Sequence, residues 1–202
     1  IELKNNRDWM LSIVKENGLA LKYASDELKN NQFIVLNAVV QDPSALQYAS
    51  DKMRRDKNVV LAAVMQNVSA LKYAFQDMKN EEVVMLAAVT QDVSILEDAS
   101  EKMKENAVVV RAAVKKDGSA LKYASTTLQN NKAVVLAAVQ QKGLALKYAS
   151  KDMKNDEVVV RAAVTQNASA LEYASQELRK NRDFMLAAVT QDASAFQYAD
   201  ED

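Results

Sequence analysis

The side chains best suited to chemistry are a lysine and a serine three residues apart, Lys22 and Ser25, in a pattern that recurs at 122–125 and 147–150. Residues three apart share one face of a helix, so the lysine could activate the serine hydroxyl as a nucleophile. However, the chain has no histidine and no cysteine, which removes the common acyl-transfer triads. Catalytic groups are also not normally repeated at every period of a chain. We therefore expect no catalytic residue and no enzyme activity.

The sequence also lacks the usual sites for metals and cofactors. Without cysteine or histidine it cannot form a typical zinc site, and the spacing of an aspartate-rich calcium loop is absent. Three glycines cannot form a glycine-rich phosphate loop. Carboxylate pairs such as Glu81 and Glu82 are adjacent, so they point to different faces of a helix. We expect no metal and no cofactor.

Charge and hydropathy exclude two further classes of partner. The chain has 202 residues, with 26 basic against 27 acidic side chains, so its net charge is −1. Proteins that bind nucleic acid usually carry a strongly basic domain, so we expect no nucleic-acid partner. No apolar run reaches the ~18–20 residues of a membrane span. The sequence starts at Ile1 rather than Met and leaves the compartment open, whether cytoplasmic or secreted into a host cell.

One short sequence motif is repeated along the chain. The letters ALKYAS stand at 20–25, 120–125 and 145–150, and close variants recur at every 25 residues between and beyond them. Self-similarity at a fixed period of 20 to 50 residues is typical of stacked repeat proteins. We divide the chain into eight units: 4–28, 29–53, 54–78, 79–103, 104–128, 129–153, 154–178 and 179–202.

Within a unit, the repeated apolar positions have helical spacing. Met10, Ile13 and Val14 lie at i, i+3 and i+4, and a second set begins at Leu21 and continues through Ala24 and Leu28. The spacing predicts two helices in the first unit, over residues 7–16 and 18–29. An Asn or Asp is expected to cap the second helix in each unit except at Lys142, where we expect a frayed start. Paired asparagines end the unit, because asparagine tolerates the left-handed conformation that stops a helix.

The predicted fold is all-α: an α-solenoid, superhelical, of eight 25-residue helix-turn-helix repeats. A single long helix would also keep a 25-residue period in line, since 25 is close to seven turns. Pro43 and the paired asparagines argue against it. Helices of ~10–12 residues are marginal alone in water, so stacking on neighbouring units must stabilise them. We expect one glutamine column to form a hydrogen-bonded ladder: Gln41, Gln66, Gln91, Gln141, Gln166 and Gln191.

The repeat resembles a bacterial tandem-repeat family known as domain of unknown function 4116. The resemblance is carried by LQNNKAVVLAAVQQKGLALKYAS at 128–150 and MKNDEVVVRAAVTQNASALEYAS at 153–175, and it covers essentially the whole chain. The chain departs from the pattern at Asp98, which replaces the repeated tyrosine, and at Arg111 and Arg161, which replace a leucine. The resemblance implies a repeat array within a larger bacterial protein and implies little about activity.

Three sets of residues are candidates for a partner surface. A tyrosine column lies one residue off the strict core face, and it either packs across the seam between units or forms an aromatic ladder for a peptide or base. Arg111 and Arg161 either mark a local site or an exposed helix edge. Columns that vary between copies are a third candidate. The tyrosines are Tyr23, Tyr48, Tyr73, Tyr123, Tyr148, Tyr173 and Tyr198, and one variable column is Lys15, Val40, Met65, Thr90, Lys115, Gln140, Thr165 and Thr190.

The sequence therefore predicts a non-enzymatic scaffold that presents an extended surface to a protein or peptide. A second hypothesis is a structural protein that self-associates through the array ends into oligomers or filaments, because neither end looks like a polar capping unit. A repeat-based reader of nucleic acid is a third, weaker alternative.

Overall fold

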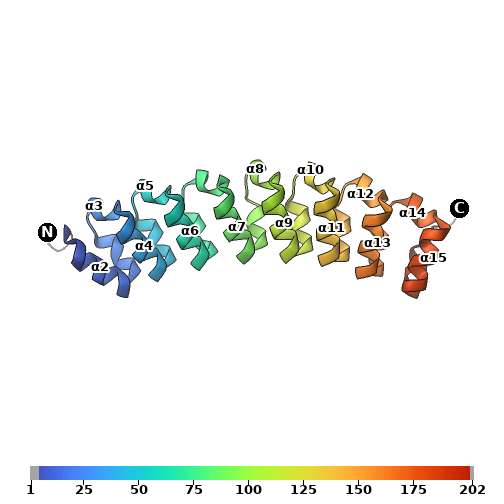
Figure 1. Cartoon of the computed structure of the whole chain (residues 1–202), viewed down its shortest axis with the longest axis horizontal. Helices are drawn as coiled ribbons and strands as arrows, with labels where there is room; N and C mark the ends of the chain where they lie inside the picture. Colours follow the sequence, from blue (N-terminus) through green and yellow to red (C-terminus); the bar gives the residue numbers. More distant parts are fainter. Residues whose placement is uncertain (1–4, 201–202) are drawn as a thin grey trace. The chain divides into compact units, whose positions relative to one another are not determined.

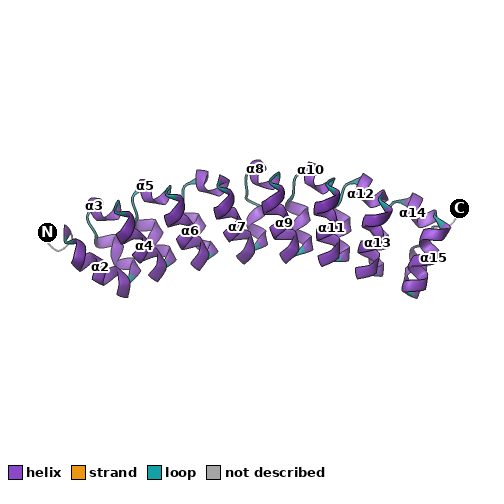
Figure 2. Cartoon of the chain, viewed as in Figure 1, coloured by secondary structure: helices purple, strands orange, loops and turns teal. Residues whose placement is uncertain are grey.

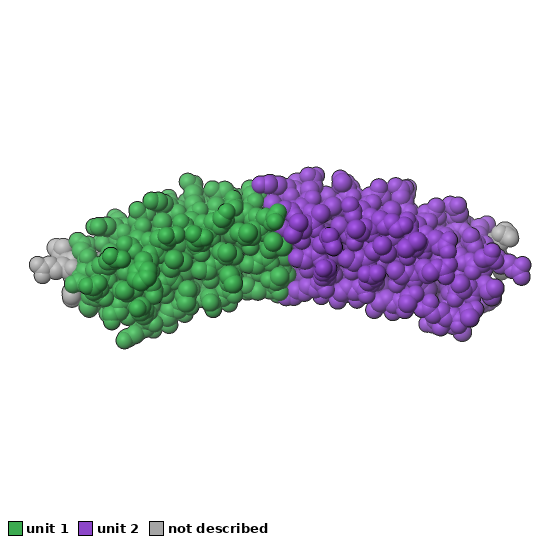
Figure 3. All heavy atoms as spheres, in the orientation of Figure 1, with its two compact units in different colours: residues 1–92 green, residues 93–202 purple. Residues whose placement is uncertain are grey.

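The computed structural model describes residues 5–200, and over that range the chain is helical, with no β-strand (Figure 2). It divides into two compact units, residues 1–92 and residues 93–202 (Figure 3). Each is treated separately below. Leu3 and Lys4 lie outside the described residues, and Lys4 is the predicted start of the first repeat. The last two residues of the eighth repeat also lie outside them.

Unit 1 repeats a triplet of a ten-residue α-helix, a 3-10 helix and a shorter helical segment (Figure 1). The long helices predicted at 7–16 and equivalent positions are confirmed. The elements in order are α2 (Arg7–Glu16), η1 (Gly18–Tyr23), α3 (Asp26–Lys29), α4 (Gln32–Gln41), η2 (Pro43–Tyr48), α5 (Asp51–Arg54), α6 (Lys57–Gln66), η3 (Val68–Tyr73), η4 (Gln76–Asn80) and α7 (Glu82–Gln91).

Unit 2 continues the same order of elements. Its first 3-10 helix is short and ends before Glu97 and Asp98, where the sequence departs from the repeat. The elements are η5 (Val93–Leu96), α8 (Glu101–Lys104), α9 (Ala107–Lys116), η6 (Gly118–Tyr123), α10 (Thr126–Gln129), α11 (Lys132–Gln141), η7 (Gly143–Tyr148), α12 (Lys151–Asn155), α13 (Glu157–Gln166), η8 (Ala168–Tyr173), α14 (Gln176–Lys180), α15 (Arg182–Gln191) and η9 (Ala193–Tyr198).

The prediction of one second helix over 18–29 is wrong. In the first triplet that stretch holds η1 and α3, separated by extended backbone at Ala24 and Ser25. The Ala24 N–H closes the 3-10 helix on Leu21, and the Ser25 hydroxyl accepts from the Leu28 N–H as the N-cap of α3. Serine competes with the helix backbone in this way, so it starts a new helix instead of continuing the old one.

Two expectations about the turns also need correction. No residue in the described range has a positive φ, so Asn30 ends α3 at φ −97° rather than in the left-handed region. Its neighbour Asn31 does cap α4, accepting from the Ile34 N–H at 3.2 Å. The helix after Lys142 is not frayed, because η7 is six residues long, like η6, and the Gly143 N–H donates to the Gln166 side chain at 2.6 Å.

The core of each unit is a row of long helices packed in chain order on the 3-10 helices. In unit 1, α4 packs against α2 and α6; in unit 2, α11 packs against α9 and α13. Helices α4, α6, α11 and α13 each also contact the 3-10 helix of their own triplet and that of the preceding triplet, as α11 contacts η7 and η6. Four positions are buried in each long helix from α4 to α13, for example Val134, Val135, Ala138 and Val139 in α11, whereas α2 buries two and α15 three. These apolar faces explain why the same columns recur at every period.

The predicted glutamine ladder is confirmed where these side chains bridge successive triplets. Gln141 accepts from the Gly118 N–H at 2.6 Å and donates to the Lys116 carbonyl at 3.3 Å. Those two groups belong to the start of η6 and the end of α9, where a helix leaves its backbone unpaired. One side chain from the following triplet therefore satisfies both ends of the turn. Gln41 does the same for Gly18 and Glu16.

Backbone hydrogen bonds make a second link between triplets. The Ser150 N–H donates to the Gln129 carbonyl at 3.0 Å, and the Ser50 N–H donates to the Lys29 carbonyl at the same distance. In each case the donor lies in the break after a 3-10 helix, and the acceptor lies at the end of the preceding short helix. The break at Ala149 and Ser150 thus positions an N–H for the neighbouring triplet, in addition to starting α12.

Glycine at the start of a 3-10 helix permits this close approach. A Cβ on Gly118 would lie 2.3 Å from the Ala138 carbonyl oxygen, well inside van der Waals contact. Val68 occupies the same position of the repeat in unit 1. There the bridging Gln91 side chain donates to the carbonyl of Val64 rather than to the carbonyl two residues before Val68. The spacing between neighbouring triplets is therefore adjusted to the residue at this position.

We expect Gly118→Val to destabilise the chain by about 1–3 kcal/mol, because the added side chain must push α11 away from η6. Urea unfolding followed by circular dichroism measures the effect. Ala193→Val is the matched control, since Ala193 occupies the same column at an exposed position. Equal unfolding midpoints for the two variants would contradict this account of the packing.

Candidate interaction surfaces

The outer face of α4, α6 and α7 in unit 1 is uncharged and largely apolar. Helices α4, α6 and α7 turn their second, fifth, sixth and ninth residues away from the core, and none of these is charged. Four large side chains there are between 42% and 64% exposed: Phe33, Val40, Met65 and Val83. Because α4 packs on α6 and α6 packs on α7, the four belong to one surface. Exposed apolar patches of this kind mark interaction sites more often than scattered single residues do.

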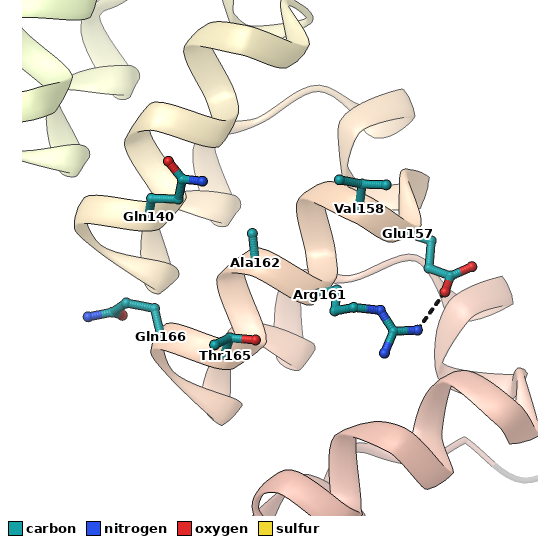
Figure 4. Close-up of a pocket in the computed structure, with 7 residues that line it drawn as sticks. All are labelled: Gln140, Glu157, Val158, Arg161, Ala162, Thr165 and Gln166. Carbon is teal, nitrogen blue, oxygen red and sulfur yellow. Dashed lines mark hydrogen bonds and ion pairs between the residues drawn. The ribbon is translucent and has the colours of Figure 1, made fainter.

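The outer face in unit 2 carries charge and is hollowed. A hollow of about 590 Å³ is lined by Gln140 of α11 and by residues of α13, with Val158 and Ala162 as its apolar wall. Figure 4 shows Ala162 on the side of α13 that faces α11 and Arg161 turned toward Glu157. The variable column predicted as a candidate contributes Gln140 and Thr165 to this hollow. Both residues are exposed, and their role in binding stays a prediction.

The structure separates the two arginines that the sequence grouped together. Arg161 forms an ion pair with Glu157 at 2.6 Å, and its guanidinium lies 5.5 Å from the centre of the Phe184 ring. A guanidinium held by a carboxylate four residues earlier and by an aromatic ring has its preferred partners within the fold. Arg161 therefore shapes the rim of the hollow and is already paired.

Arg111 has no such partners. The residue four positions earlier is Ala107, and the position that corresponds to Phe184 is Val134. Among residues 93–200, no carboxylate lies within ion-pair distance of Arg111, nor of Lys115 one turn further along the same face. Both side chains are exposed. The described part of unit 2 therefore supplies no anion to these two cations on the outer face of α9.

The tyrosine column lies on the 3-10 helices rather than on the long helices. Tyr23 is exposed, and the other six tyrosines are partly buried. Each of the seven is the last residue of a 3-10 helix, and the repeat with Asp98 at this position has no tyrosine. In four triplets the preceding lysine sits over the ring: Lys22 at 4.6 Å from the Tyr23 centroid, Lys72 at 4.8 Å from Tyr73, Lys122 at 4.4 Å from Tyr123 and Lys147 at 4.7 Å from Tyr148. These rings already have an intramolecular cation partner.

Electrostatics couple these pairs along unit 2. Hydrogen bonding to the Tyr148 hydroxyl is the main cause that raises the pKa of Lys147, and Tyr173 of the next triplet adds to it. The pKa of Lys122 is raised in the same way by Tyr123, with a smaller contribution from Tyr148. The tyrosines therefore favour the charged form of Lys122 and Lys147. The tyrosine column does not bring Arg111 or Arg161 into the same site, because those arginines lie on the long helices.

Sequence reasoning found only part of the apolar outer face of unit 1. Val40 and Met65 belong to the variable column named as a candidate surface, but Phe33 was not among the candidates. The signal was present in the spacing, because Phe33 and Val40 are seven residues apart and share a helix face. The core columns at Ile34, Val35, Ala38 and Val39 would have shown that this face points outward.

The chain matches the family model described as "Domain of unknown function (DUF4116)" six times. Each match covers about two periods, and the first five overlap and step along the chain by about one period, whereas the sixth follows the fifth without overlap: residues 6–54, 31–79, 56–104, 80–129, 109–154 and 156–202. The chain belongs to this family. No curated protein and no solved structure matches the chain. In the part of this DUF4116 array that the structure describes, no helix is both long and apolar enough to cross a membrane, and no group of acidic side chains is arranged to hold a metal ion.

We expect Tyr148→Phe to lower the pKa of Lys147 while leaving that of Lys22, in unit 1, unchanged. The substitution keeps the ring and removes the hydroxyl that raises the lysine pKa. Because folding raises this pKa, the interaction stabilises the fold below the ordinary lysine value and is lost as pH rises through the folded value. NMR titration of ¹³C-labelled lysine side chains measures both groups in one sample. An unchanged titration midpoint for Lys147 would show that the hydroxyl is not its partner.

Proposed function

We propose that this chain is a segment of an α-solenoid with eight 25-residue repeats, and that it acts as a non-enzymatic scaffold for protein or peptide partners. The sequential packing of α2, α4 and α6 in unit 1, and of α9, α11 and α13 in unit 2, supports the architecture. The step of about one period between the first five family matches supports the repeat length. In such arrays each repeat contacts its neighbours and leaves one long surface free for binding.

One observation carries the binding role: most large apolar side chains that remain exposed lie on the outer face of the long helices. Folding has buried the inner columns, so an exposed apolar side chain at a regular outer position keeps an unfavourable contact with water. A partner that covers the outer face would remove it. The side chains concerned are Phe33, Val40, Met65, Val83, Val108, Val158 and Leu186.

Site-specific photo-crosslinking tests this proposal. Benzoylphenylalanine replaces Met65 or Val108 on the outer face, or Gln47 or Glu172 on the 3-10 helices, giving one test and one control position in each unit. All four residues are exposed, so the fold tolerates the substitutions. In extracts of the source cells we expect severalfold more adduct with a defined protein from the outer positions, identified by mass spectrometry. Adducts that form only from the controls, or equally from all four, would contradict the proposal.

A second candidate function is self-assembly through the last repeat. Phe196 is 72% exposed, whereas the leucines of its column, from Leu21 to Leu171, are almost fully buried. Phe196 lines a hollow of about 450 Å³ with Met185, Leu186 and Val189. In the earlier triplets of unit 2 the columns of Met185, Val189 and Phe196 are buried. In this candidate function another copy of the chain covers them here.

If self-assembly is the function, sedimentation velocity will show a size that increases with concentration. Phe196→Ser should then abolish the increase, because it removes the largest exposed apolar side chain of this face. Phe33→Ser makes the same chemical change on the outer face of unit 1 and should leave the increase intact. A wild-type chain that sediments as a monomer from low to high micromolar concentration excludes this candidate.

A further inference from the structure

The outer face of unit 2 combines two cations with an apolar hollow. Helix α9 carries the unpaired cations Arg111 and Lys115, and the α11–α13 hollow offers the apolar wall of Val158 and Ala162. Helix α11 packs on both α9 and α13 and so lies between them. Its outer residues are uncharged: Ala133, Leu136, Ala137 and Gln140.

We propose that this face binds an acidic peptide segment, with carboxylates on Arg111 and Lys115 and an apolar side chain in the hollow beside Ala162. The proposal rests on the scaffold function above and gives it a partner chemistry. The positive charges at the site lack an internal anion, which makes an anionic partner complementary.

The position of Arg111 makes it the stronger part of the argument. Lys115 lies in the last turn of α9, where the helix dipole already stabilises a cation. Arg111 lies one turn earlier and has neither that field nor a carboxylate. Two like charges at i and i+4 also repel one another on a helix. A carboxylate bound between them relieves this repulsion, and the planar guanidinium of Arg111 can hold it with two hydrogen bonds.

The neighbouring cations of unit 2 are not available in the same way. Lys132 pairs with Asp156 at 2.7 Å, and the same contact lowers the pKa of the Asp156 carboxyl. Arg161 pairs with Glu157. The anion-binding part of the face is therefore limited to α9. Helix α13 contributes the apolar contact, and the charge of Arg161 at the edge of the hollow is neutralised by Glu157.

A peptide is favoured over nucleic acid on two grounds. Two cations are too few for a phosphate backbone, which is normally tracked by a basic groove, and the whole chain has a net charge of −1. The aromatic rings that could stack bases are the tyrosines of the 3-10 helices, which lie on different elements from the hollow.

The spacing of the helices sets the length of the segment. Neighbouring packed helices are about 8–10 Å apart, so α9 and α13 are roughly 16–20 Å apart. An extended chain advances about 3.3 Å per residue, so about five or six residues span the distance between carboxylate and apolar side chain. The expected ligand therefore has two acidic residues, an uncharged spacer of that length, and a leucine or a similar side chain.

Fluorescence anisotropy with synthetic peptides tests the proposal on the full chain. The probes carry an aspartate pair and a leucine pair separated by about four to seven uncharged residues, a range that brackets the helix spacing. Matched probes replace aspartate with asparagine or leucine with serine, and a fluorescent oligothymidylate serves as the nucleic-acid probe. The protein variants are Arg111→Leu with Lys115→Gln, which install residues found in the same columns of other repeats and so preserve the fold. The control pair, Lys102→Gln with Lys151→Gln, removes the same charge from exposed residues of short helices.

We expect the aspartate probes of intermediate length to bind about fivefold more tightly than the asparagine probes, as two exposed ion pairs allow, and to weaken at high salt. The Arg111/Lys115 variant should lose that advantage, and the Lys102/Lys151 variant should retain it. Val158→Ser should weaken the leucine probes and leave the serine probes unaffected, because it removes part of the apolar wall.

The proposal is overturned if no probe binds, if aspartate and asparagine probes bind equally, if both double variants behave alike, or if the oligothymidylate binds more tightly than the peptides. Such a result, together with partner adducts from Met65 and Val108, removes the acidic partner and leaves the scaffold function standing. Absence of adducts from both outer positions removes the scaffold function itself.

Discussion

The structure depends on backbone groups that a triplet cannot satisfy by itself. The last carbonyl of a short helix such as α10 has no partner within its own triplet, although the N–H groups of Asn130 and Asn131 pair with the three carbonyls before it. The turn between α9 and η6 leaves both a carbonyl and an N–H unpaired. The next triplet provides the missing partners: the Ser150 N–H for Gln129, and the Gln141 side chain for Gly118 and Lys116. Each such bond contributes about 0.5–1.5 kcal/mol net, but leaving the groups buried and unpaired would cost more. Neighbouring triplets in each unit are therefore required for the elements within them.

This requirement explains what could and could not be predicted from the sequence. The long helices follow from local information, because apolar spacing and an Asn or Asp cap are both encoded within ten or so residues, as at Asn31 and α4. The break at Ala49 and Ser50 is different. It places the Ser50 N–H for a hydrogen bond to Lys29 of another triplet, and only the weaker local signal of serine followed by Asp51, typical of a helix start, marks it. The period was apparent, but the path of the chain within it was not.

The candidate surfaces show the same division. Exposure of the variable outer column could be predicted, because the inner columns are occupied by constant valine and alanine. The difference between Arg111 and Arg161 could not be predicted from their shared column. It depends on Glu157 within the same helix and on Phe184 in the next one, and both must be placed before either arginine can be called free. Once the helical register is known, the corresponding Ala107 and Val134 explain why Arg111 lacks partners.

The outer face has a freedom that the rest of the repeat lacks. An inner residue such as Ala138 contacts neighbouring triplets, so any change there must suit more than one contact, and the column stays small and apolar. An outer residue such as Val108, which is 56% exposed, is not enclosed by them and can change at less cost to stacking. The apolar outer residues of α4 and α6 in unit 1 and the basic outer residues of α9 in unit 2 are therefore independent of the frame that carries them. A frame of this kind can acquire different partner chemistry in different repeats while its packing remains the same, which is the property expected of a binding array rather than of a catalytic fold.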